Sequence, residues 1–248
     1  MTRQTTGIEK IGAIAQNPQR LLRLLQRFYW QLVASPLTRD SADDPYHQVF
    51  QTFLHTVYQR PSPQILELGA RNVSNNPTRR LFPNPGKYVG FDIHPGEGVD
   101  VVGDIHQLSA YFPADTFDVV YSLSVFEHLA MPWKAILEIN QVMKVGGLLF
   151  ISTHPTFPKH ELPWDFWRFS EAAFGVLLNP TTGFERITSA EGLPCSIVPL
   201  VREGWMKGMA IEPANLGVAV LARKVANTDA RLRWDVTTGD VTSGIYPL

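Results

Sequence analysis

Short apolar runs that each end at an acid or a glycine are the feature that most limits how this chain can fold. One run, residues 64–68, leads into Gly69, and a second, residues 87–91, ends at Asp92. Short runs of this kind are typical of buried parallel strands, and ligands of parallel sheets bind where the strands end. The pattern predicts an α/β domain with a nucleoside-type site at that edge.

The same pattern recurs along the middle of the chain, with helical patterns between several of the runs. This alternation predicts a doubly wound, mainly parallel sheet with helices on both faces. After residue 153 the order changes to an aromatic, proline-rich segment, a helix near 171–179 and later strand-like runs at 196–201 and 216–222. The five strands expected before that point cover residues 65–68, 87–92, 99–103, 117–123 and 148–153.

Proline, glycine and polar residues divide the chain into three parts. Residues 1–60 are expected to form an N-terminal helical extension, with one helix ending near 35 and another over 46–60 that stops at a Pro-Ser-Pro sequence. Residues 61–225 form the sheet domain, and residues 226–248 are a polar tail that we expect to be loosely held.

Composition excludes some partners and names none. The 248 residues carry a formal charge of -1, so no overall field draws nucleic acid, and we expect no nucleic-acid partner. The single cysteine, Cys195, excludes an internal disulfide framework and suits a reducing, cytoplasmic compartment.

An N-terminal segment, residues 21–33, carries leucines and aromatic residues at helical spacing with arginines between them. The interruptions are too frequent for a membrane span or a signal sequence, so no transmembrane segment is expected. A helix that packs on the core or forms a homo-oligomer contact explains the pattern, and a helix lying on a membrane surface is the alternative.

The glycine content of the first turn separates two classes of nucleotide site. A pyrophosphate needs several glycines, because backbone amides must approach it closely. Here Gly69 is followed by Arg71 and Val73 where further glycines would stand. Asp92 lies 23 residues beyond Gly69, a suitable distance for a carboxylate that binds both ribose hydroxyls. An adenosine without phosphates therefore fits better than a dinucleotide.

At this point the chain resembles the class I S-adenosylmethionine-dependent methyltransferases of the Rossmann-like, type 11 kind, over roughly residues 64–153. Five blocks in the expected order carry the resemblance: 65–69, Asp92, 103–105, 117–129 and 145–151. The resemblance implies S-adenosyl-L-methionine as the cofactor. The cofactor-binding residues that it implies are Glu67, Gly69, Arg71, Asp92, Ile93, Asp104, Ile105 and Ser122.

Several of these residues have structural alternatives. Glu67 and Asp104 are also placed to cap the helix that follows each of them. Glu127 and His128 either contact the cofactor or close a helix start. Arg71 either pairs with the cofactor carboxylate through its guanidinium or, together with Val73, narrows the pocket of a non-catalytic member.

Residues 153–170 contain the densest aromatic and ionisable sequence of the chain, and we expect them to form a lid over the acceptor. His154 and His160 are the candidate catalytic bases, because an imidazole titrates near neutrality. The spacing of His154, His160 and Glu161 matches no helical zinc motif, so no metal is expected. In the alternative, the aromatic residues anchor the segment and Arg168 pairs with Asp165 or Glu161.

The sequence therefore predicts an S-adenosylmethionine-dependent methyltransferase that acts on a small-molecule or glycan-type acceptor by direct displacement. The neutral charge and the aromatic lid favour such acceptors over nucleic acid. A non-catalytic cofactor-binding or scaffold protein of the same fold is the alternative. A nicotinamide oxidoreductase ranks last because its phosphate-binding glycines are missing.

Overall fold

The computed structural model describes residues 18–34, 43–73, 78–198 and 212–232. The chain separates into two compact units, residues 1–41 and 42–248. The described part of the first unit is the helix α2 (Pro18–Ala34). The sheet and all of the other described helices belong to the second unit.

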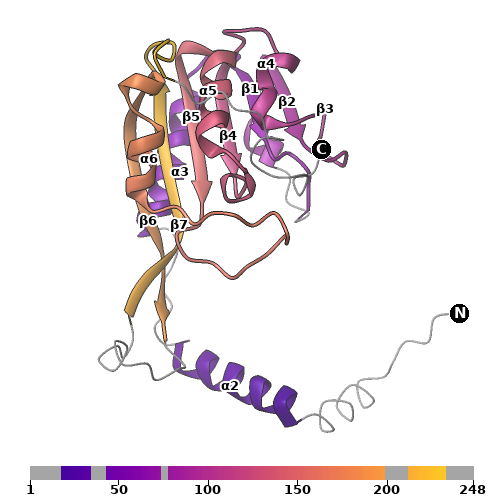
Figure 1. Ribbon diagram of the computed structural model, residues 1–248, viewed down its shortest axis with the longest axis vertical. Helices are drawn as coiled ribbons and strands as arrows, with labels where there is room; N and C mark the ends of the chain where they lie inside the picture. The colour runs from indigo at the N-terminus through magenta and orange to yellow at the C-terminus, as the bar shows by residue number, and fades with distance from the viewer. Residues whose placement is uncertain (1–17, 35–42, 74–77, 199–211, 233–248) are drawn as a thin grey trace, which may run out of the picture. The chain divides into compact units, whose positions relative to one another are not determined.

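The second unit is built on a seven-stranded sheet in the order β3-β2-β1-β4-β5-β7-β6 (Figure 1). Strands β1 to β5 are parallel, whereas β7 runs antiparallel to both β5 and β6. This arrangement confirms the predicted doubly wound, mainly parallel sheet. The strands are β1 (Gln64–Leu68), β2 (Lys87–Asp92), β3 (Val101–Val102), β4 (Phe117–Leu123), β5 (Met143–Thr153), β6 (Phe184–Ile197) and β7 (Glu212–Lys224).

Alternating side chains along the strands build two separate cores, one on each face of the sheet. Helix α3 (Pro45–Tyr58) covers one face, and Phe53 lies at the centre of that core with no exposed surface. Its ring stacks on Phe150 of β5, with 4.7 Å between the ring centroids. Asp44 caps the start of α3 by accepting a hydrogen bond from the amide of Tyr46. Thus α3, assigned from the sequence to the N-terminal extension, packs on the sheet.

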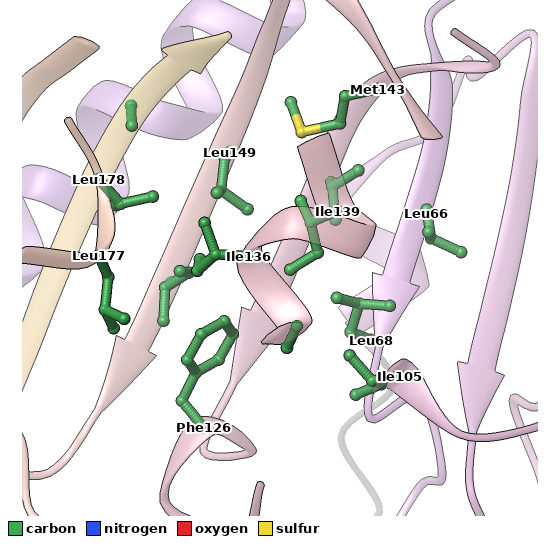
Figure 2. Packing of buried hydrophobic residues seen from close by; sticks show 14 of the residues in the cluster. Leu66, Leu68, Ile105, Phe126, Ile136, Ile139, Met143, Leu149, Leu177 and Leu178 are labelled. Carbon is green, nitrogen blue, oxygen red and sulfur yellow. The ribbon is translucent and has the colours of Figure 1, made fainter. Parts of the chain in front are cut away.

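The opposite face is covered by α4 (Leu108–Tyr111), α5 (Pro132–Val142) and α6 (Glu171–Leu177). Figure 2 shows Ile136 and Ile139 of α5 among side chains of β1 and β5. Leu66 and Leu68 point to this face, while the preceding residue, Ile65, points to the α3 face. The inner strands β1, β4 and β5 therefore contribute to both cores, which explains why their runs are largely apolar.

The C-terminal strands differ most from the sequence prediction. Strand β6 covers Phe184–Ile197, most of which was not predicted, and the run expected over 196–201 lies partly outside the described residues. Most of β6 is half-buried or exposed, so it lacks the dense apolar signal of the inner strands. The polar tail is held at its start, where Asp229 donates its amide to the carbonyl of Thr181, and residues 233–248 lie outside the description.

Helix α2 exposes eight large apolar side chains among the positions whose burial is described, and Phe28 and Leu32 are each 65% exposed. The helix contains three arginines and no acidic residue. Within the described residues, no helix combines the length and the apolar character needed to cross a bilayer.

Candidate active site

A cavity of about 470 Å³ opens where β1, β2 and β4 end. Its walls come from the turns that follow these three strands and from the segment 154–170, called the lid loop below. Six of the eight predicted cofactor-binding residues line it: Glu67, Gly69, Arg71, Asp92, Ile93 and Ile105.

The turn after β1 has a backbone shape that requires glycine. Gly69 has φ = +80°, and a Cβ atom built there would lie 2.2 Å from Cγ2 of Val125. Gly98, on the facing turn, has φ = +90°, and a Cβ atom there would lie 2.6 Å from the carbonyl oxygen of Ala70. Two turns thus approach each other closely at the cavity without side chains between them.

Asp92 is placed at the end of β2 with its carboxylate tied to the backbone. Oδ2 accepts a hydrogen bond from the amide of Arg71 (3.1 Å), and Oδ1 accepts one from the amide of His94 (2.9 Å). The residue is 9% exposed and lines the cavity. Because a carboxylate offers about four acceptor sites, Asp92 keeps capacity for ligand hydroxyls after these two bonds.

Arg71 lines the same cavity, and its Nε atom is buried. Within the described residues, this Nε has no hydrogen-bond acceptor. A buried donor without a partner is unfavourable by about 1–3 kcal/mol. A guanidinium placed in this way fits a carboxylate ligand, which it binds through two parallel hydrogen bonds.

Glu67 accepts hydrogen bonds from hydroxyl groups that the sequence did not indicate as its partners. Its carboxylate accepts hydrogen bonds from Thr78 Oγ1 and Tyr88 Oη, and the Tyr121 hydroxyl bonds to both donors. Burial, followed by the negative charge of Glu67, raises the pKa of Tyr88 and of Tyr121 well above the usual range. The tyrosines therefore stay neutral and act as hydrogen-bond donors.

The two remaining predicted contacts, Asp104 and Ser122, do not line the cavity. Asp104 caps a short 3-10 helix, η4 (Ile105–Gln107), and accepts hydrogen bonds from the amide and from Nδ1 of His106. His106 is fully buried, and its Nε2 accepts from the amide of Met131 (3.1 Å). Asp104 thus has the capping role given as its alternative, and Ser122 is fully buried in β4.

The lid loop is fastened at several points along its length. Asp165 holds Arg168 through two hydrogen bonds of 2.6 and 2.8 Å and accepts the amide of His160. The bonds from Arg168 hold the pKa of Asp165 well below its usual range. Trp167 Nε1 donates to the carbonyl of Leu129 (2.8 Å). Glu161 and Trp164 face the cavity, as expected for a lid.

The structure gathers three histidines around one buried carboxylate beside the cavity. The Nε2 atoms of His154, His160 and His128 lie 3.4, 3.8 and 3.9 Å from Oε1 of Glu127. Glu127 has no exposed surface, and Oε1 has no hydrogen-bond partner within the described part of the chain. His128 also lines the cavity, whereas His154 and His160 do not. We call these four residues the histidine cluster.

The family comparison covers the central strands. Residues 66–151 match the sequence model of a family described as Methyltransferase domain. This segment is a methyltransferase domain. Among proteins with curated functions, none matches the sequence.

Solved structures show the same fold as this methyltransferase domain. The YcgJ protein from Bacillus subtilis matches with a TM-score of 0.51 and 15% identity, over 71% of this chain and 97% of its own. A SAM-dependent methyltransferase from Archaeoglobus fulgidus has a TM-score of 0.51 and 15% identity, over 79% of this chain and all of its own. At 15% identity, these comparisons show a shared fold and do not show a shared function.

The cavity of the methyltransferase domain fits the chemistry of the cofactor. S-adenosylmethionine, the cofactor that the sequence resemblance implies, carries ribose hydroxyls and an amino-acid carboxylate; the cavity offers an acceptor in Asp92 and a guanidinium in Arg71 whose Nε has no partner among the described residues. Ile93 and Ile105 supply apolar walls. Val73, the second departure from the glycine pattern, is 71% exposed, so most of its side chain faces solvent.

Proposed function

We propose that this chain transfers a methyl group from S-adenosylmethionine to a small-molecule or glycan-type acceptor held under the lid loop. One observation carries the proposal: a single cavity joins the proposed cofactor residues at the strand ends to Glu161 and Trp164 of the loop. An acceptor bound against the loop would therefore share a water-poor space with the cofactor.

The cofactor supplies a methyl group that is already activated by a positively charged sulfur. The protein must then mainly bind, align and exclude water. In our proposal Asp92 accepts hydrogen bonds from the ribose hydroxyls of the cofactor, and the guanidinium of Arg71 binds the cofactor carboxylate. Gly69 and Gly98 let the turns that contain them approach other parts of the chain closely, because neither has a side chain. Trp164 separates the acceptor from solvent.

An acceptor hydroxyl must also lose its proton. His154 and His160 remain the proposed groups for this task, as members of the histidine cluster. One member of the cluster, His128, lines the cavity. The Nε2 atom of His154 lies 3.2 Å from the hydroxyl of Ser124, which also lines the cavity. Both histidines would act on the acceptor through their neighbours, because neither lines the cavity.

A non-catalytic scaffold is the second candidate. It differs from the methyltransferase in that it would bind the cofactor but form no methylated product. The Nε of Arg71, which has no acceptor in the described part of the chain, favours cofactor binding, which both candidates share. Cofactor binding with no product from any acceptor would favour the scaffold. The half-buried, free Cys195 suits a reducing compartment, and we propose a cytoplasmic location on that ground.

Calorimetric titration with S-adenosylmethionine and S-adenosylhomocysteine tests the site. We expect the wild type to bind both, and Asp92→Asn to lose about tenfold or more in affinity, since one charged acceptor is replaced by an amide. Asp43→Asn, an exposed acid outside the cavity, is the matched control. A folded wild type that binds neither compound would contradict the proposal.

A further inference from the structure

The histidine cluster contains a buried carboxylate oxygen that has no hydrogen-bond donor within the described residues. One oxygen of Glu127, Oε2, accepts a hydrogen bond from Thr153 Oγ1 (2.6 Å), but Oε1 has none within the described residues. A buried carboxylate oxygen without a donor is strongly unfavourable, because burial removes the water that would solvate it. The guanidinium of Arg168, on the lid loop, already binds Asp165 through two hydrogen bonds.

The other ring nitrogen of each histidine faces a backbone carbonyl. Nδ1 lies 2.8 Å from the oxygen of Trp164 in His128, 2.9 Å from that of Leu216 in His154, and 3.2 Å from that of Pro158 in His160. A carbonyl oxygen only accepts, so each Nδ1 carries the proton. In a neutral ring the lone pair is then on Nε2, the nitrogen that faces Glu127.

This pattern is the usual environment of metal-binding histidines. Such histidines donate the second ring N–H to a carbonyl or carboxylate, which fixes the tautomer and orients the ring. Nitrogen lone pairs that face a carboxylate oxygen repel it unless a proton or a metal cation lies between them. Ligand atoms of Glu127, His128 and His160 all lie within 4.8 Å of one another, and Nε2 of His154 lies 3.4 Å from Oε1 of Glu127 and 3.2 Å from Oγ of Ser124.

We propose that Glu127, His128, His154 and His160 bind one divalent cation of the zinc class. With metal–ligand distances of about 2.0–2.1 Å, neighbouring ligands of a tetrahedral site are about 3.4 Å apart. The distances from Glu127 Oε1 to the three Nε2 atoms, 3.4–3.9 Å, need only small movements to reach that geometry. Three imidazoles and one carboxylate favour Zn²⁺ or Co²⁺ over Mg²⁺, which prefers oxygen ligands.

The ligands come from three segments that are separate in the sequence. Glu127 and His128 follow β4, His154 follows β5, and His160 belongs to the middle of the lid loop. A bound cation would fasten the loop to the strand ends and displace the contact between Ser124 and His154. Resting on the proposed function, an ion with four protein ligands would have no open position for the acceptor, so it would hold the lid loop in place beside the acceptor, and His154 and His160 would then bind the ion and not take the proton of the acceptor.

Zinc binding by the full chain tests the proposal. Purified protein is stripped with a chelator and titrated calorimetrically with zinc chloride, and one ion per chain is expected. The double variant His154→Ala/His160→Ala is expected to bind more than about 100-fold more weakly, because changes even beyond the direct ligands reduce metal affinity by 10- to 100-fold. His55→Ala removes an imidazole of α3 outside the cluster and should bind like the wild type.

A second variant, Glu127→Gln, covers the case in which the double variant does not fold. Glutamine keeps the shape and one carbonyl oxygen but removes the charge, so we expect at least about tenfold weaker zinc binding. The visible absorption of the Co²⁺-loaded wild type should be lost in the same variants. Absence of zinc uptake by the wild type, or wild-type affinity in the folded variants, would overturn the proposal.

S-adenosylhomocysteine binding in the same preparations separates this proposal from the proposed function. Zinc binding without cofactor binding would support the metal site and contradict the methyltransferase proposal. Cofactor binding without zinc binding would support cofactor binding by this domain and contradict the metal site.

Discussion

At the scale of single residues, the cavity depends on a few side chains whose hydrogen-bond partners are fixed. Asp92 and Glu67 are both acids at strand ends, yet their surroundings differ. Asp92 receives two backbone amides, while Glu67 receives the hydroxyls of Thr78 and Tyr88. Position at a strand end therefore predicts that an acid lies near the ligand, but only its donors show what the acid binds.

Arg71 allows a test that separates the two ends of the cofactor. If its guanidinium binds the cofactor carboxylate, Arg71→Met should weaken S-adenosylhomocysteine binding by about 10- to 100-fold, the effect of a lost charge-assisted hydrogen bond. Binding of 5′-methylthioadenosine, which lacks the carboxylate, should not change. Arg80→Met, on an exposed neighbour, is the control. Equal losses for both ligands would show that Arg71 acts by shaping the turn.

Gly69 and Gly146 form a matched pair for measuring crowding. Both have φ near +80°, but a Cβ atom at Gly69 would overlap Val125, whereas nothing lies within 4 Å of one at Gly146. Alanine at Gly146 should lower the free energy of unfolding by about 1–3 kcal/mol through backbone strain alone. Alanine at Gly69 should lower it further and weaken cofactor binding. Urea denaturation measures both, and equal effects would contradict the close packing at Gly69.

At the scale of elements, prediction from the sequence succeeded where the signal was local. The bounds of β2 and β4 were predicted from short, largely apolar runs, and both strands have the predicted bounds. Strand β6 was missed because most of its side chains are half-buried or exposed without regular alternation, and Gly192 and Pro194 interrupt it. Its pairing with β7 forms the strand, and one strand alone does not reveal such a partner.

Helix α2 gives a prediction at the same scale. Its exposed apolar face and its arginines match a helix that lies on an anionic membrane surface. The wild type should cosediment with anionic vesicles at low salt and less at high salt, because salt screens the charges. Leu25→Glu/Phe28→Glu should abolish cosedimentation, and Val176→Glu, an exposed apolar residue of α6, should not. A wild type that stays in solution would leave an oligomer contact as the explanation of α2.

At the scale of the whole molecule, the sheet separates two cores that the sequence predicts to different degrees. The alternation along β1 predicts two buried faces but does not say which helix covers which face. Nor does it bring together Glu127, His154 and His160, which belong to three segments and become neighbours only through the fold. Sequence spacing therefore predicted the cavity better than it predicted the histidine cluster.

The α3 core gives a prediction for global stability. Phe53 is fully buried between Phe150, Phe82 and Tyr121. Phe53→Ala should lower the free energy of unfolding by about 3–5 kcal/mol, because it removes a large buried ring and leaves a cavity. Val225→Ala, at a site 42% exposed, should change it by less than about 0.5 kcal/mol. A small effect at Phe53 in denaturant unfolding would show that α3 is not part of the cooperative core.

The position of β7 between β5 and β6 affects how the protein is made. During synthesis the ribosome releases β5 and then β6 while the place between them is still empty, because β7 ends only at Lys224. Until then β5 exposes an unpaired edge, the kind of edge that pairs with other chains. We therefore expect the nascent chain to be prone to aggregation just before β7 emerges, when a chaperone would protect it best.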